Sequence, residues 1–148
     1  MTILHIDFET RGTLDLREVG LHRYARHKDT DVWCMAWAFD DAEPSVHEAK
    51  DWPYITQGSP PLAHVAGGGL VYSHNVIFVL EIWNQIMVPR YGWPRLRPEQ
   101  TYCTMAMSYA MGLPGALEDV AYALGLRFQK DTAGYTLIDD VLLVPLVS

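Results

Sequence analysis

The feature that most constrains this chain is the alternation of side chains at its start. Apolar and ionisable residues take turns there: Leu4, Ile6 and Phe8 alternate with His5, Asp7 and Glu9. A period of two predicts a β-strand over residues 2–8, with the apolar side chains on one face and the ionisable ones on the other. Two carboxylates therefore project from the same face, two residues apart.

Two interpretations of these carboxylates are open. An edge strand with one face in water carries such a pattern without any further role. A first strand flanked by later elements is usually central, however, and carboxylates there lose hydration unless a cation compensates. Divalent metal ions prefer carboxylate oxygens as ligands, so the sequence favours a metal site at Asp7 and Glu9.

Composition places the chain among ordinary globular proteins. It has 148 residues, of which 49% are hydrophobic and 20% charged, which predicts one domain over residues 1–148 and excludes a disordered chain. No apolar run approaches the ~20 residues of a membrane helix, so no membrane partner is expected. The two cysteines, Cys34 and Cys103, form no CxxC motif, and we expect a reducing cytoplasm.

Charge is distributed unevenly along the chain. The net charge of -7 argues against bulk electrostatic coating of nucleic acid. Residues 10–28 are nevertheless mainly basic, and residues 29–51 are mainly acidic. A second basic cluster, Arg90, Arg95 and Arg97, is interleaved with Tyr91 and Trp93. A mixture of basic and aromatic side chains is suited to binding single-stranded nucleic acid. The favoured interpretation is an ordinary solvated surface, on which the arginine stems cover apolar patches.

Periodicity and turn residues predict a mixed α/β fold. Further strands are expected at residues 32–39, 45–49, 70–73 and 100–103, and helices at residues 60–67, 75–88, 104–111 and 115–124. Asn75 is expected to cap its helix. Three strands with tight connections, followed by alternating helices and strands, indicate a mixed sheet covered by helices.

Ordered motifs resemble one family. His5-Ile6-Asp7-Phe8-Glu9-Thr10 resembles the first motif of the DEDD-type 3′–5′ exonucleases, and in particular of the proofreading domain of phage-type family A DNA polymerases. Later matches, running to about residue 138, are Arg11 to Leu16, Val19 to Ala25, Tyr72-Ser73-His74-Asn75, Phe78, Ile82-Trp83-Asn84, Cys103 to Ala106, Gly112 to Leu117, Ala123 to Leu126 and Gln129-Lys130-Asp131.

The resemblance implies a ribonuclease H-like fold, with three antiparallel strands followed by parallel ones, C-terminally truncated here. It also implies Mg²⁺ or Mn²⁺ in a two-metal site formed by four acidic residues. By position, Asp7 and Glu9 would be the first metal ligands and catalytic residues. Substrate-binding roles near the 3′-terminal nucleotide fall on Thr10, His74, Asn75 and Phe78.

The second motif departs from the family, because Phe78 is followed by Val79 where an acid is expected. Glu81 cannot substitute, since two residues of a helix correspond to about 200° of rotation. We expect Glu81 to join Asn84 and Gln85 on a solvated face. Val79 extends an apolar stripe that continues through Ile82, Trp83 and Ile86, so it is expected in the core.

The third motif has one weak candidate. Tyr135 and Asp139 have the spacing of base and metal ligand, but His27–Asp31 and His47–Asp51 have it too. Residues 141–147, interrupted by Pro145, resemble a strand or an irregular tail rather than the family's late helix. Tyr135 and Asp139 therefore remain weakly supported.

Three functions stay open. The first is a metal-dependent 3′–5′ exonuclease domain acting on single-stranded DNA 3′ ends, weakened by the loss of an acid and operating with a polymerase domain. The second is a nucleic-acid-binding module that has lost hydrolysis. The third is a truncated polymerase remnant, motivated by the apolar tail. The first has the strongest motif support.

Overall fold

The computed structural model describes residues 1–127, in two compact units that meet between Thr104 and Met105. The first unit contains, in order, β1 (Ile3–Arg11), α1 (Leu16–Val19), α2 (Leu21–Arg26), β2 (Asp31–Phe39), β3 (Ser45–Glu48), the 3₁₀ helix η1 (Ala49–Tyr54), α3 (Pro60–Ala66), β4 (Leu70–Ser73), α4 (Val76–Ile82), the π-helix η2 (Trp83–Met87), α5 (Val88–Tyr91), the 3₁₀ helix η3 (Pro98–Gln100) and β5 (Thr101–Cys103). The expectation of one domain over residues 1–148 stays a prediction.

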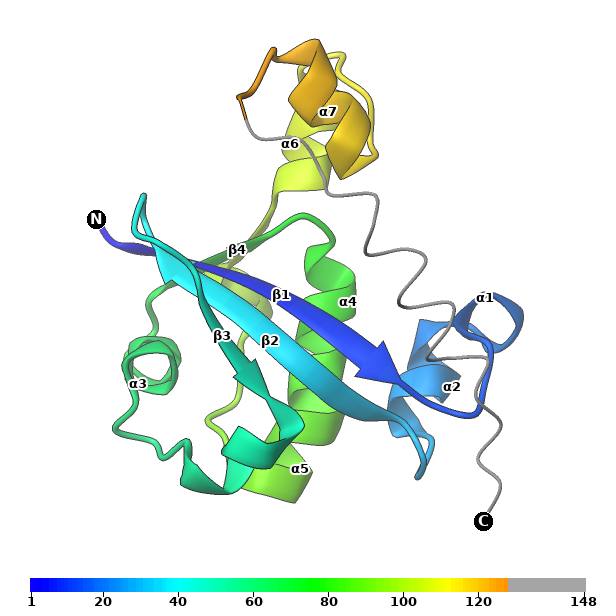
Figure 1. The fold of residues 1–148 in the computed structure, drawn as a ribbon, viewed down its shortest axis with the longest axis vertical. Coiled ribbons are helices and arrows are strands. Elements are labelled where there is room, and N and C mark those ends of the chain that lie inside the picture. The colour runs from blue at the N-terminus through cyan, green and yellow to red at the C-terminus, as the bar shows by residue number, and fades with distance from the viewer. Residues whose placement is uncertain (128–148) are drawn as a thin grey trace. The chain divides into compact units, whose positions relative to one another are not determined.

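The strands form a five-stranded sheet in the order β3-β2-β1-β4-β5 (Figure 1). The pairs β1–β2 and β2–β3 are antiparallel, whereas β1–β4 and β4–β5 are parallel. The predicted α/β fold, with three antiparallel strands followed by parallel ones, is confirmed, and this strand order is compatible with a ribonuclease H-like fold. The first strand is central, with antiparallel and parallel neighbours on its two sides.

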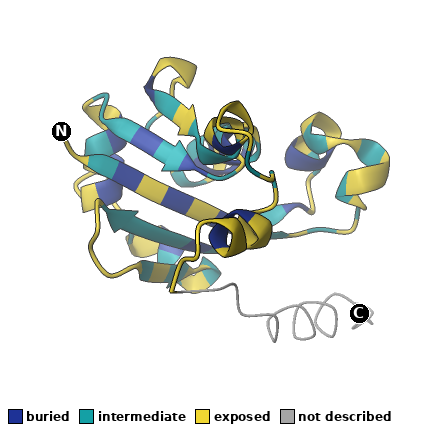
Figure 2. Cartoon of the chain, turned by 90° about the horizontal axis from the view of Figure 1, so that it is seen from above, coloured by how far each residue is buried: buried dark blue, intermediate teal, exposed yellow. Residues whose placement is uncertain are grey.

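Burial along β1 follows the predicted alternation, and Figure 2 colours the strand in alternating bands. Leu4, Ile6 and Phe8 are buried, while Asp7 and Glu9 are exposed. A central strand therefore has one buried face and one face with exposed polar side chains, rather than two buried faces. The strand also extends three residues beyond the predicted end at residue 8, because β2 continues to pair with it as far as Arg11.

The core lies on the apolar face of the sheet. Helices α2, α3, α4 and η2 contribute buried side chains to it, among them Tyr24, Leu62, Val65, Val79, Ile82, Trp83 and Ile86. Phe8 of β1 packs against Trp83, with ring centroids 6.1 Å apart. Trp93 lies between Trp83 and Trp52, at 4.8 and 5.8 Å. This aromatic chain fixes the long helix against the middle of the sheet.

The consecutive elements α4, η2 and α5 form one long helix. The sequence predicted that this helix would end at residue 88, but it continues to Tyr91. Its middle, η2, is π-helical, and Pro89 follows within the first turn of α5. A proline has no backbone N–H to donate, so a widened turn before it preserves the helical path. Gly92 ends the helix in the left-handed conformation, at φ 69°.

The second unit begins at Met105, and its described part holds most of α6 (Thr104–Ala110) and all of α7 (Leu117–Ala123). Both helices were predicted from sequence within a few residues of these bounds. The 3₁₀ helix η1 was not predicted. Residues 1–127 contain no helix that is both long and apolar enough to cross a membrane.

Candidate metal and nucleic-acid site

The carboxylates of Asp7 and Glu9 lie on the same face of the central strand. Two residues of an extended strand span about 7 Å, so the two side chains start close together and project in parallel. Asp7 pairs across the ladder with Ala36, and Glu9 pairs with Cys34. The ladder neighbours of both acids in β2 are small side chains. The predicted juxtaposition of the two acids is thus present in the fold.

The thiol of Cys34 lies close to the negatively charged side chains of this face. Its pKa is raised, first by burial and then by the charge of Glu9, with smaller effects from Asp7 and Glu48, while a hydrogen bond with the Glu9 backbone acts in the opposite direction. Glu48 of β3 is the ladder partner of Cys34 on the other side. A row Glu9, Cys34, Glu48 therefore crosses three strands, with the carboxylate of Glu48 paired to the ammonium of Lys50 at 2.8 Å.

The parallel strands end beside the acidic pair. β4 pairs with β1 through Ile3↔Leu70 to His5↔Tyr72 and ends at Ser73, one residue before His74. Nδ1 of His74 lies 3.0 Å from Oγ1 of Thr104, which follows β5. Ligands of open α/β sheets bind beyond the carboxyl ends of strands at such a change of strand direction. The substrate-binding role expected for His74 stays a prediction.

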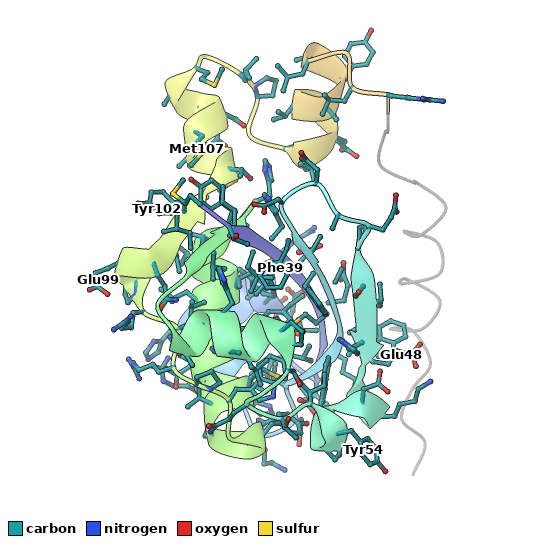
Figure 3. All side chains as sticks on the ribbon, turned by 90° about the vertical axis from the view of Figure 1, so that its left-hand side faces the viewer. Phe39, Glu48, Tyr54, Glu99, Tyr102 and Met107 are labelled. Carbon is teal, nitrogen blue, oxygen red and sulfur yellow. The ribbon has the colours of Figure 1, made fainter. Side chains whose placement is uncertain are left out.

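An aromatic row lies next to the acids on the same face. The rings of His5 and Tyr72 are 6.0 Å apart in an edge-on arrangement, and those of Tyr72 and Tyr102 are 5.0 Å apart. Tyr102 is 42% exposed. Figure 3 labels Tyr102 and Glu48, which belong to the two edge strands of the sheet. The sequence analysis missed this row and Cys34; the alternation within residues 32–39 and 70–73 was the available signal.

Thr10 does not share the face of Asp7 and Glu9. Its hydroxyl forms a hydrogen bond with the hydroxyl of Tyr24, at 2.9 Å, and its ladder partner is the buried Val32. Alternation places Thr10 on the side of Ile6 and Phe8. In the structure Thr10 thus fastens α2 to β1, directly after Glu9.

Asn75 and Phe78 lie at the start of the long helix. Asn75 occupies the predicted N-cap position and is exposed, but its side chain makes no capping hydrogen bond, so that part of the prediction is wrong. Its φ of -147° and ψ of 71° lie away from the usual cap geometry. Phe78 is half-buried and packs against the core.

Val79 is part of the core, as the apolar stripe predicted, with a relative exposure of 1%. Glu81 does not lie on a solvated face, so that prediction is wrong. It lies beside two cationic or titratable side chains of α2, 2.5 Å from Nη1 of Arg26 and 3.4 Å from Nδ1 of His22. It therefore binds α2 to α4 instead of joining a solvated face.

Asn84 is also not on a solvated face. Its side-chain amide donates to the carbonyl of Leu96 at 2.8 Å and accepts from the backbone N–H of the same residue at 3.1 Å. This two-way contact holds the segment after α5 against the long helix. Gln85 is half-buried.

The aromatic residues interleaved with the second basic cluster pack against the core, whereas its three arginines are exposed. Trp93 is 3% exposed and Tyr91 donates to Asp31. Arg90 donates to the carbonyls of Thr30 and His27 and lies near the same carboxylate. These groups hold the loop between α2 and β2, although Arg90, like Arg95 and Arg97, is exposed. The structure thus gives Tyr91 and Trp93 a packing role that the sequence analysis did not expect.

Residues 1–127 contain no group of three His, Cys, Asp or Glu side chains arranged to hold a metal ion. The donor set of Asp7 and Glu9 is nevertheless suited to one Mg²⁺ or Mn²⁺, because Mg²⁺ usually binds one or two carboxylates and keeps water or substrate phosphate for its remaining ligands. Tyr135 and Asp139, with Lys130 and Asp131, lie outside the described residues.

No protein-family model matches this chain. The chain is 32% identical over 139 residues to a DNA polymerase of Bacillus phage SP02. The alignment covers 93% of this chain and 20% of the polymerase, so the chain spans about one fifth of the length of that curated relative. The similarity relates the chain to a segment of a phage DNA polymerase.

Proposed function

We propose that the chain is a metal-dependent 3′–5′ exonuclease domain of the polymerase proofreading type, acting on the 3′ end of single-stranded DNA. The observation that supports it most is the position of Asp7 and Glu9. They share one face of the central strand, at the sheet position where antiparallel pairing gives way to parallel pairing. The phage DNA polymerase similarity agrees with a DNA substrate and with a polymerase domain as partner.

Each residue of the site has a defined part in this proposal. Asp7 and Glu9 would hold Mg²⁺ or Mn²⁺, which supplies charge stabilisation to a reacting phosphate and acidifies a water. His74 directly follows β4, is oriented by Thr104, and would donate to a phosphate oxygen of the terminal nucleotide. The apolar face behind β1 keeps the two carboxylates in place, because Phe8 between them is packed on Trp83.

A second candidate function is nucleic-acid binding without hydrolysis. The residue at position 79, Val79, favours this function. The two-metal mechanism needs acids on both metals, and position 79 carries a buried valine in place of the second-motif acid. The described residues thus support one metal better than two. Removal of one charge-stabilising group from such a site costs on the order of 10²–10³ in rate.

The proposal is tested with a 3′-labelled single-stranded DNA and a titration of Mg²⁺ or Mn²⁺. The chain should release the label only in the presence of metal, and Asp7→Asn or Glu9→Gln should lower the rate at least about 100-fold. Asp41→Asn is the matched control, because Asp41 is an exposed carboxylate in the turn before β3. It should leave the rate unchanged.

The outcomes separate the two candidate functions. Label release that persists in Asp7→Asn contradicts the assigned role of the acidic pair and indicates a contaminating nuclease. DNA binding without any metal-dependent release supports the binding module. Neither binding nor release contradicts both functions.

A further inference from the structure

The connection between β1 and β2 carries three arginines that the exonuclease proposal does not use. Arg11 ends β1, Arg17 lies in α1 and Arg23 lies in α2. All three are exposed, and none of them takes part in an ion pair with another residue of the described part. We call these three residues the basic surface.

The other cations of the same connection are already neutralised. Arg26 pairs with Glu81 of α4, and the ammonium of Lys28 lies 3.5 Å from Asp29. The two acids of the segment offset part of this charge. The carboxylate of Asp15 accepts from the backbone N–H of Arg17 at 2.8 Å and Glu18 makes no ion pair among residues 1–127, so both keep their negative charge. Three arginines against two carboxylates leave this connection with a small positive charge.

The basic surface is held in place beyond the carboxyl end of β1, with α2 packed against α4 on the core side of the sheet. Leu14, Leu16 and Val19 pack against the core, which turns Arg17 toward solvent. Tyr24, next to Arg23, is buried and its hydroxyl is bonded to Thr10. Figure 1 shows α1 and α2 just beyond the carboxyl end of β1, the end at which Glu9 lies.

The close packing of the connection supports a fixed position. A Cβ added at Gly12 would lie 2.9 Å from Oγ1 of Thr30 and 3.4 Å from the ring of Tyr24. The chain after Arg11 thus passes tightly between α2 and the start of β2. Arg11 itself lies two residues beyond Glu9, about 7 Å along the strand.

We propose that the basic surface binds the sugar–phosphate backbone of single-stranded DNA whose 3′ end reaches Asp7 and Glu9. The charge alternates along this path: acidic where a metal ion is required, and basic where the phosphates of the preceding nucleotides pass. Arginine suits that role, because its planar guanidinium binds phosphate oxygens in pairs. The inference rests on the proposed function for the direction of the strand, and its binding test needs no hydrolysis.

The test measures the affinity of the full chain for a fluorescein-labelled single-stranded 12-mer in EDTA, so that no cleavage occurs. Arg17→Glu with Arg23→Glu should weaken binding at least 10-fold at 50 mM salt. It should also reduce the slope of log K against log salt by about 1.4, since each phosphate contact contributes about 0.7 for single strands. Circular dichroism and a thermal melt verify that the double variant is folded.

The matched control is Arg95→Glu, a reversal of charge at an exposed arginine on a different loop that makes no ion pair within residues 1–127. It should change the affinity less than twofold. Equal losses in the control and in the double variant, or a folded double variant that binds as tightly as the unmodified chain, overturn the inference. Failure of the unmodified chain to bind the 12-mer overturns it as well.

Failure of the inference and failure of the exonuclease proposal are distinguishable. If Asp7→Asn abolishes hydrolysis but Arg17→Glu with Arg23→Glu leaves the DNA affinity unchanged, the proposed function is supported and the role of the basic surface is contradicted. If the double variant weakens DNA binding but the unmodified chain releases no label with any metal, the role of the basic surface is supported and the hydrolytic function is contradicted.

Discussion

At the scale of single residues, the proposed site depends on two acids and one valine. Asp7 and Glu9 could be identified from alternation alone, because a strand with apolar residues on one face has only one other face for its acids. Val79 could be placed in the core because it continues a helical stripe. The contacts of Thr10 and Glu81 could not be predicted, since both partners, Tyr24 and Arg26, lie on a helix whose position depends on tertiary packing.

Val79→Glu tests whether the missing second-motif acid can be restored. Position 79 is buried, so the introduced carboxylate should lower the free energy of unfolding by about 3 kcal/mol or more at pH 8. Burial raises the pKa of this carboxyl above the ~4.3 of the unfolded chain. The folded state then binds the proton more tightly, and the destabilisation grows as pH rises from about 4.3 through the folded pKa, by about 1.4 kcal/mol per unit.

The measurement is urea unfolding between pH 4.5 and pH 8, with Val79→Gln as the uncharged control of similar size. The control should be destabilised by an amount that does not depend on pH. A Val79→Glu chain with the same stability at both ends of this range contradicts the prediction and indicates that position 79 opens toward the acidic pair.

At the scale of elements, regular patterns were predictable and their modifications were not. Strands β2, β3, β4 and β5 lie within one or two residues of their predicted bounds. The extra residues of β1 depend on pairing with β2, and the continuation of the long helix past Val88 depends on the π-helical η2. Neither feature has a local signal, because both arise from packing between segments distant in sequence.

Asn84→Ala measures how firmly the long helix is joined to the segment that leads to β5. The change removes both hydrogen bonds with Leu96 and leaves its backbone N–H and carbonyl without that partner. The free energy of unfolding should fall by about 1–3 kcal/mol, determined by chemical denaturation. Gln85→Ala, at the next position of the same helix, should cost less than about 1 kcal/mol. Equal effects of the two changes contradict the role of Asn84.

At the scale of the whole molecule, the sequence predicted the α/β class and the change from antiparallel to parallel pairing. The division at Thr104 had no composition signal, because no glycine-, proline- or serine-rich linker marks it. It follows instead from contacts: within residues 1–127, all strands of the sheet and all members of the hydrophobic core cluster lie before residue 105. The first unit should therefore not depend on the second for its core.

A fragment of residues 1–104 tests this independence. All five tryptophans lie within it, and Trp52, Trp83 and Trp93 are buried together. The fragment should unfold cooperatively and its tryptophan emission maximum should match that of the full chain within about 2 nm, because the indoles keep an apolar environment. A red-shifted maximum together with a non-cooperative melt contradicts the prediction.

The position of Cys34 between Glu9 and Glu48 has a consequence for redox chemistry. Oxidants and disulfides react with the thiolate, and the raised pKa of Cys34 makes that form scarce near neutral pH. Sulfenic acid formation and mixed disulfides are therefore disfavoured at this residue. Burial and the neighbouring carboxylates thus act together to keep this sulfur in its less reactive, protonated form.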